Sequence, residues 1–132
     1  MHNFNARGVF LKDNLIVNKT KQFAIRIVNL YKFLCDEKNE YVLSKQLLRS
    51  GTSIGANVRE GVRGQSSSDF AMKMNIALKE ASETEYWLEI LYETGFLTEQ
   101  QFESIYADCV EINKILNSIV KTTYEKIKGE KA

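Results

Sequence analysis

A set of four cations is the first feature of this 132-residue sequence whose residue types and spacing could do chemistry. The set is Lys45, Arg49, Arg59 and Arg63, and the three arginines share one line of a helical wheel. Such a line can hold nucleic-acid phosphates through charge alone, and this binding weakens strongly with salt. No aromatic residue interleaves with it, so it offers no surface on which bases could stack. The pattern is compatible with backbone binding to RNA or DNA and argues against base readout.

A second set is acidic and falls in one later segment: Glu80, Glu83, Glu85, Glu89 and Glu93. An exposed helix face is the simpler interpretation, and the alternative is that this face pairs with the arginine line of a neighbouring subunit. Glu83 falls near apolar positions, so we expect it to be partly buried and bonded to Asn57 or to a nearby serine, because buried carboxylates need partners. A metal-dependent enzyme, with a metal site built from Glu60 and Glu83, is a further hypothesis.

The residues that enzymes of helical-bundle type use are missing. The sole histidine is His2, near the start of the chain, and there is no Glu-x-x-His pair of the kind that holds two iron ions in a bundle. An Arg–His ribonuclease pair is excluded for the same reason. Gly61 and Gly64 form a GxxG turn that lacks the surroundings and the GK[ST] ending of a P-loop. The sequence therefore predicts no enzyme, with no catalytic residue, no cofactor and no bound metal.

Composition sets the broad class of the protein. The chain is 44% apolar and 27% charged and contains no proline, which is typical of a water-soluble, mostly helical domain. No apolar run approaches the roughly 18 residues that cross a bilayer, and the first residues lack the apolar core of a signal peptide. We therefore expect a cytoplasmic protein that does not engage membranes.

The small net charge of +1 hides an uneven distribution. Residues 1–63 carry 11 Lys/Arg and 5 Asp/Glu, a balance of +6, whereas residues 64–132 carry 7 and 12, a balance of −5. Such a division can attract one half of a domain to the other, one subunit to the next, or the basic half to an anionic partner. Composition does not choose among these.

Apolar residues recur at three- and four-residue steps through four segments, separated by short polar or glycine-containing turns. The spacing predicts helices from about residue 18 to 35, 42 to 61, 67 to 94 and 98 to 128. Expected helix caps are Asn18 or Thr20 for the first, Ser67 or Ser68 for the third, which should stop at Gly95, and a Thr98–Gln101 capping box for the fourth. The inner face of the third helix is expected to comprise Phe70, Met74, Ala77, Ala81, Leu88 and Leu91. Short connections favour antiparallel neighbours, so the expected fold is all-α, an antiparallel up-and-down four-helix bundle. We expect residues 1–17 to form a tail, residues 18–128 the bundle domain, and residues 129–132 a frayed end.

The second of these segments contains unusually poor helix formers, in the stretch LLRSGTSIGANVREG. Glycine within a helix costs roughly 1 kcal/mol relative to alanine, a loss that is tolerable where another backbone must approach closely. Gln46, Ser50, Ser53, Asn57 and Glu60 follow steps of four and three residues and so line one face. Small polar side chains in register favour close helix packing, within the chain or between subunits, with hydrogen bonds across the contact.

This stretch carries a resemblance to a known family. QLLRSGTSIGANVREG, the following SSSDFAMKMNIALKEASETEYWLEILYETGFL, and the earlier FAIRIVNLYKFL are similar to the 23S rRNA intervening-sequence proteins. The similarity covers roughly residues 15–120. The family's signature positions are occupied by Arg49, Ser50, Ser53, Ile54, Asn57, Glu60, Glu83, Trp87 and Leu88.

The resemblance implies a small bacterial four-helix bundle that assembles into a homopentameric ring, with no characterised biochemical role. It implies a scaffold or adaptor, and a structural role for the residues that we expect at helix-packing or subunit contacts: Gln46, Ser50, Gly51, Ser53, Ile54, Gly55, Asn57, Glu60, Glu83 and Trp87. The related accessory variability proteins of diversity-generating retroelements bind nucleic acid and a reverse transcriptase. A nucleic acid, or a protein associated with one, is thus the alternative partner, although those relatives are strongly basic and this chain is nearly neutral.

Overall fold

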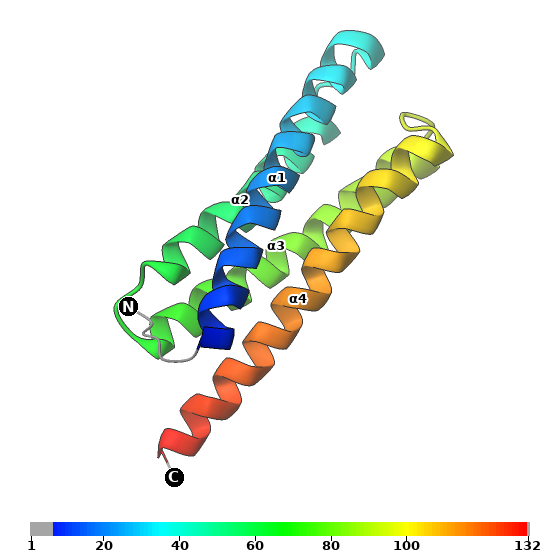
Figure 1. The fold of residues 1–132 in the computed structure, drawn as a ribbon. Helices are drawn as coiled ribbons and strands as arrows, with labels where there is room; N and C mark the ends of the chain where they lie inside the picture. Colours follow the sequence, from blue (N-terminus) through cyan, green and yellow to red (C-terminus); the bar gives the residue numbers. More distant parts are fainter. Residues whose placement is uncertain (1–6, 132) are drawn as a thin grey trace.

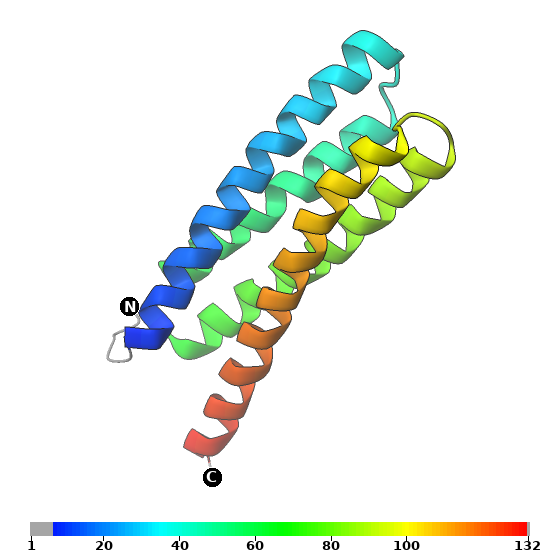
Figure 2. The same cartoon turned by 45° about the vertical axis from the view of Figure 1, so that its right-hand side comes forward.

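The computed structural model describes the backbone of residues 7–131 and the side chains of residues 15–130. Its four helices are α1 (Arg7–Lys38), α2 (Leu43–Val62), α3 (Ser67–Glu93) and α4 (Glu99–Lys131). They run alternately up and down, so that each helix lies beside the next one in the chain (Figures 1 and 2). The predicted all-α four-helix bundle is confirmed. In the described part of the chain, no helix is long and apolar enough to cross a membrane.

Helix α1 begins at Arg7, well before the expected start near residue 18. Ile16 is fully buried and lies seven residues before the buried Phe23, so the apolar stripe continues back into the segment expected to be a tail. Thr20, considered as a helix cap, instead lies inside α1 and donates from its hydroxyl to the Ile16 carbonyl at 2.7 Å. At the other end α4 is helical to Lys131, so residues 129–131 are not frayed; residues 1–6 and 132 lie outside the described residues.

The core is one continuous cluster of apolar side chains from all four helices. The predicted inner positions of α3 are all buried: Phe70, Met74, Ala77, Ala81, Leu88 and Leu91. Two ion pairs join α1 to α4 at the edge of this cluster, Lys19 with Glu111 at 2.7 Å and Arg26 with Asp108 at 2.6 Å. The chain thus closes into a bundle in which α1 neighbours both α2 and α4.

The ends of the helices follow from local hydrogen bonding. Gly95, at φ 88°, ends α3, with the Phe96 amide donating to the Leu91 carbonyl and the Gly95 amide to the Tyr92 carbonyl. The predicted capping box of α4 is present, because Thr98 and Gln101 exchange side-chain-to-backbone bonds at 2.9 and 3.1 Å. The cap of α3 is Ser66, just before the two serines that the sequence suggested.

Helix α2 is capped by a carboxylate from the preceding turn. Glu40 is only 8% exposed, and its side chain accepts bonds from the backbone amides of Val42, Leu43 and Ser44 at 2.6–3.0 Å. Burial opposes ionisation, but these bonds to the charged form outweigh it and lower the pKa of Glu40. The first turn of α2 therefore depends on an ionised Glu40.

The glycines of α2 allow it to lie close to α1 and α3. A Cβ at Gly51 would lie 2.7 Å from Cγ1 of Ile27, and one at Gly55 would lie 3.2 Å from the Thr20 carbonyl oxygen, both on α1. A Cβ at Gly61 would lie 3.0 Å from Cβ of Lys73 on α3. The close helix packing predicted from these residues is therefore realised inside the chain.

Substituting Gly51→Ala should destabilise the bundle despite the higher helix propensity of alanine. The propensity gain is about 1 kcal/mol, whereas forcing atoms into a filled core costs typically about 1–3 kcal/mol. We expect a lower urea midpoint for Gly51→Ala. Gly129→Ala is the matched control, because a Cβ at this position would have no atom within 4 Å, and it should be neutral or stabilising. Equal stability of both variants would contradict the close approach.

Glu40→Gln should lower the free energy of unfolding at neutral pH by about 1–3 kcal/mol, because amides of α2 lose a charged acceptor. The folded-state pKa lies below the unfolded value of about 4.3, so the carboxylate stabilises the fold above that value. This contribution is lost as the pH falls through the folded-state pKa. The difference between wild type and variant should therefore shrink in acid. Exposed Glu37→Gln should show no such difference in chemical unfolding followed across pH.

Candidate functional site

Part of the signature of α2 is used in packing within the chain. Ser50, Gly51 and Ile54 are buried, and the Thr84 hydroxyl on α3 donates to the Ser50 hydroxyl at 3.0 Å. A buried hydroxyl pair of this kind fixes how two helices align, because shifting either one would leave polar groups unpaired. These residues therefore position α2 against α3.

The rest of that polar line lies nearer the surface. Gln46 is exposed, while Ser53 and Asn57 are half-buried. Ser53 donates to the Arg49 carbonyl at 2.6 Å, and Asn57 donates to the Ser53 carbonyl at 2.8 Å. Both of these bonds stay within α2, so this edge presents small polar side chains beside α3.

Arg49 ties α2 to α3 through two carboxylates. Its guanidinium donates to both carboxylate oxygens of Glu80 at 3.2 Å and to Glu83 at 2.6 Å. Glu83 also accepts from the Trp87 indole at 3.0 Å, and the indole bond and then the arginine lower the pKa of Glu83. The expectation that Glu83 bonds to Asn57 or a serine is wrong. The long side chain of Arg49 contacts Glu83 instead.

The acidic set of α3 is largely engaged within the chain. Tyr106 on α4 donates to Glu89 at 2.6 Å, which raises the pKa of Tyr106, and Asn113 on α4 donates to Glu85. Of the five, only Glu93 is strongly exposed. The expectation of a solvent-exposed acidic face is therefore wrong for Glu80, Glu83, Glu85 and Glu89.

The structure does not bring Glu60 and Glu83 together. Glu60 pairs with Lys73 at 2.8 Å, whereas Glu83 belongs to the Arg49 pair, ten residues further along α3 and so about 15 Å away along the axis. Among the side chains that the structure describes, no group of three or more His, Cys, Asp or Glu could hold a metal ion. His2 lies outside the described residues. Cys109 is buried, which raises the pKa of its thiol, and it donates to the Ala81 carbonyl.

The predicted line of cations divides into two groups. Arg49 is engaged with α3, but Lys45, Arg59 and Arg63 are exposed and have no carboxylate within 4.0 Å in the part of the chain that is described. Arg59 and Arg63 lie beside Lys21 of α1, a residue that the sequence analysis missed. Lys21 sits nearly forty residues earlier in the chain, so only the pairing of α1 with α2 could reveal it.

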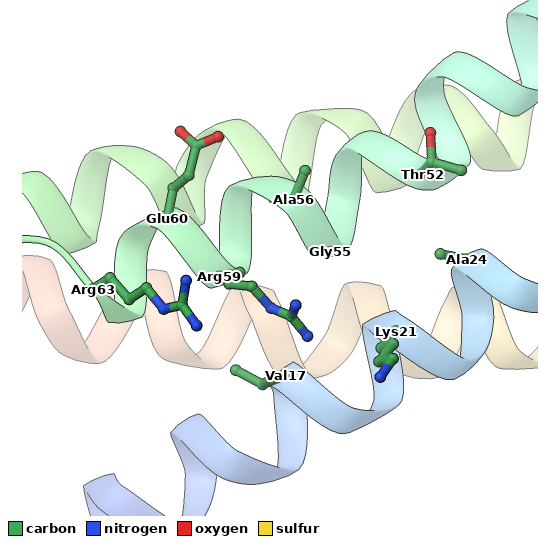
Figure 3. Close-up of a pocket in the computed structure, with 9 residues that line it drawn as sticks. All are labelled: Val17, Lys21, Ala24, Thr52, Gly55, Ala56, Arg59, Glu60 and Arg63. Atoms are coloured by element: carbon green, nitrogen blue, oxygen red, sulfur yellow. The ribbon is translucent and has the colours of Figure 1, made fainter.

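A groove between α1 and α2, which we call the α1/α2 groove, has a volume of about 450 Å³ and is bordered by Lys21, Arg59 and Arg63. Small residues line it, and Figure 3 shows both arginine side chains lying over the gap toward α1 while Glu60 points to the other side of α2. Its lining includes Lys21, Ala24, Gly55, Ala56, Arg59 and Arg63. The arrangement of described cations can attract an anion.

A second surface follows the outer side of α3, which we call the outward line. Its members are spaced by four and three residues: Met72, Ile76, Lys79, Glu83, Tyr86 and Ile90. Met72 is 51% and Tyr86 54% exposed, and Ile76 and Ile90 are half-buried. The sequence analysis assigned apolar residues of α3 to its inner face and overlooked this second line, although its spacing could have revealed it.

Comparisons with known proteins place the chain. No curated protein matches it. A crystal structure of a protein of unknown function from the S23 ribosomal protein family of Bacteroides thetaiotaomicron VPI-5482 is 62% identical, with a TM-score of 0.82. The match covers 83% of this chain and 98% of that one. The family model of the 23S rRNA-intervening sequence protein matches residues 12–118, most of the length, and the chain belongs to this family.

Proposed function

We propose that this protein is a non-enzymatic, cytoplasmic scaffold or adaptor that works as a homo-oligomer, with five subunits as the expected number. The observation that carries the proposal is the outward line of α3. The line advances by alternating four- and three-residue steps, the spacing by which one helix packs along another, and four of its six members are apolar or aromatic. The inner face of α3 already fills the core of its own chain, so the outward line supports packing by a helix from elsewhere.

The neighbouring surface of α2 suits such a contact. The small side chains Ser53 and Asn57 border α3, and Arg49 holds Glu83 in place on the outward line itself. Small residues permit close approach, and a carboxylate already paired with an arginine costs less to bury than an unpaired one. Two further residues expected at contacts are Gln46, which is exposed, and Trp87, which is half-buried against the core and donates to Glu83.

A second copy of the chain is the occupant that the charge distribution favours. Helix α3 carries two Lys/Arg and six Asp/Glu, whereas α1 carries seven and three. A contact between the acidic side of one copy and the basic side of the next joins two different surfaces. Such head-to-tail contacts close into rings when the rotation permits.

The proposal predicts the mass of the protein in solution. Five copies of a 15.2 kDa chain give 76 kDa by light scattering. The double variant Met72→Glu/Tyr86→Glu should be monomeric while keeping its helical circular dichroism, because each added carboxylate would be buried without a partner. Tyr124→Glu, at a tyrosine of 46% exposure on α4, should leave the mass unchanged.

Two results would contradict different parts of the assembly proposal. A wild-type mass of 15.2 kDa at micromolar concentration would remove the assembly proposal altogether. An oligomer that is unaffected by Met72→Glu/Tyr86→Glu would remove the outward line as the contact and keep the assembly.

Binding of RNA or DNA backbones is the second candidate function. It is supported by Lys45, Arg59 and Arg63, which are exposed and without a carboxylate partner among the described side chains. A ring would repeat these cations around one assembly, and repetition converts weak contacts into measurable avidity. Arg49 leaves this set because Glu80 and Glu83 already neutralise it.

The triple variant Lys45→Gln/Arg59→Gln/Arg63→Gln should abolish fluorescence-anisotropy binding to a long single-stranded RNA at about 50 mM salt, where phosphate contacts are strongest. Lys114→Gln/Lys121→Gln, two exposed cations of α4, is the control and should retain it. Absence of wild-type binding in this salt would exclude the candidate.

A further inference from the structure

We propose that the α1/α2 groove is a binding site for a small phosphate monoester, with the phosphate held by Lys21, Arg59 and Arg63 and an apolar body lying on the groove floor. This site does not depend on assembly of the chain. It differs from a nucleic-acid surface in taking a compact ligand, whose charge sits at one end.

What sets the cations of the groove apart is that three of them line one groove from two helices while forming no ion pair in the described structure. Lys19, Arg26, Arg49 and Lys73 each meet a carboxylate at 2.6–2.8 Å. Lys21, Arg59 and Arg63 come together from two helices, and none has a carboxylate within 4.0 Å in the described structure. A position at the end of a helix does not explain all three cations. Arg59 lies in the last turn of α2, but Lys21 lies in the middle of α1.

The one acidic residue along the groove does not cancel this charge. Glu60 turns away from the gap in Figure 3, and its carboxylate pairs with Lys73 of α3 at 2.8 Å. Among the described side chains of the groove, three positive charges therefore remain without a carboxylate paired to them. A phosphate monoester, with a charge of about −1.5 to −2 at neutral pH, matches this better than a single carboxylate.

The floor of the groove is made of small residues. Ala24 lies on α1, Gly55 and Ala56 lie on α2, and the two backbones approach so closely that a Cβ at Gly55 would meet the Thr20 backbone at 3.2 Å. The Thr52 hydroxyl donates to the Leu48 carbonyl at 2.7 Å and so is committed to its own helix. The floor thus offers apolar contact beside the cations.

Size and composition favour a compact ligand over a polynucleotide. The volume of about 450 Å³ falls within the usual range of small-molecule sites, about 300–1,000 Å³. None of the described side chains that line the groove is aromatic, so they offer bases no stacking surface. Guanidinium groups bind phosphate oxygens in pairs, which suits a terminal phosphate whose oxygens are all free.

The test measures binding of hexyl phosphate to the full chain by titration calorimetry at about 50 mM salt, where phosphate contacts are least screened. Wild type should bind one hexyl phosphate per chain and bind hexanol much more weakly. Arg59→Gln/Arg63→Gln should weaken hexyl phosphate binding by about tenfold or more, because charge-assisted bonds are lost. Lys114→Gln/Lys121→Gln, which removes the same charge from α4, should not.

A second variant tests the floor. Ala24→Leu should weaken hexyl phosphate binding by filling the groove while leaving binding of inorganic phosphate unchanged. Circular dichroism and the mass in solution confirm for each variant that the fold and assembly state are preserved. Equal binding of hexanol and hexyl phosphate, no saturable binding by wild type, or equal loss in the α4 control would overturn the proposal.

Two further outcomes would assign the groove to another occupant and equally overturn it. One is binding of an oligothymidylate that requires Arg59 and Arg63 while hexyl phosphate does not bind. The other is a change of mass on Arg59→Gln/Arg63→Gln without hexyl phosphate binding, which would show that a second copy of the chain fills the groove.

Discussion

The close approach of α1 and α2 is the constraint on which the rest of the structure depends. Gly51 leaves space for the Ile27 side chain, and Gly55 lets α2 lie against the backbone of α1 at Thr20. A larger side chain at either position would separate the helices, and the core would lose contacts along their whole length. The same approach places Lys21 in the lining of one groove with Arg59 and Arg63.

Polar groups then set the alignment of α2 with α3. The buried Ser50–Thr84 bond and the bidentate contact of Arg49 with Glu80 act at one level of the bundle, and the Glu60–Lys73 pair acts near the other end. Once these contacts are made, few signature residues remain for a partner. Those that remain lie beside the outward line of α3, which is why the assembly that we propose rests on this surface and not on the glycines.

The local sequence pattern predicted some features of the structure correctly and others wrongly. The Thr98–Gln101 capping box and the stop at Gly95 were predictable because both depend on residues within one turn. The start of α1 was missed because the stripe through Ile16 is sparse, and packing against the core stabilises it. The partner of Glu83 was missed because a helical wheel shows the face of a residue but not the reach of Arg49 from the neighbouring helix.

The sequence by itself determined that the chain folds as four helices, and its signature stretches determined the family, because periodicity and turn residues act over short distances. Only the tertiary structure decided which residues pack within the chain and which remain available to a partner. The sequence suggested Gly51 and Ser50 as contact residues and Arg49 as a nucleic-acid-binding cation, yet all three are used within the chain. The groove with its three cations arises only when helices distant in sequence lie side by side.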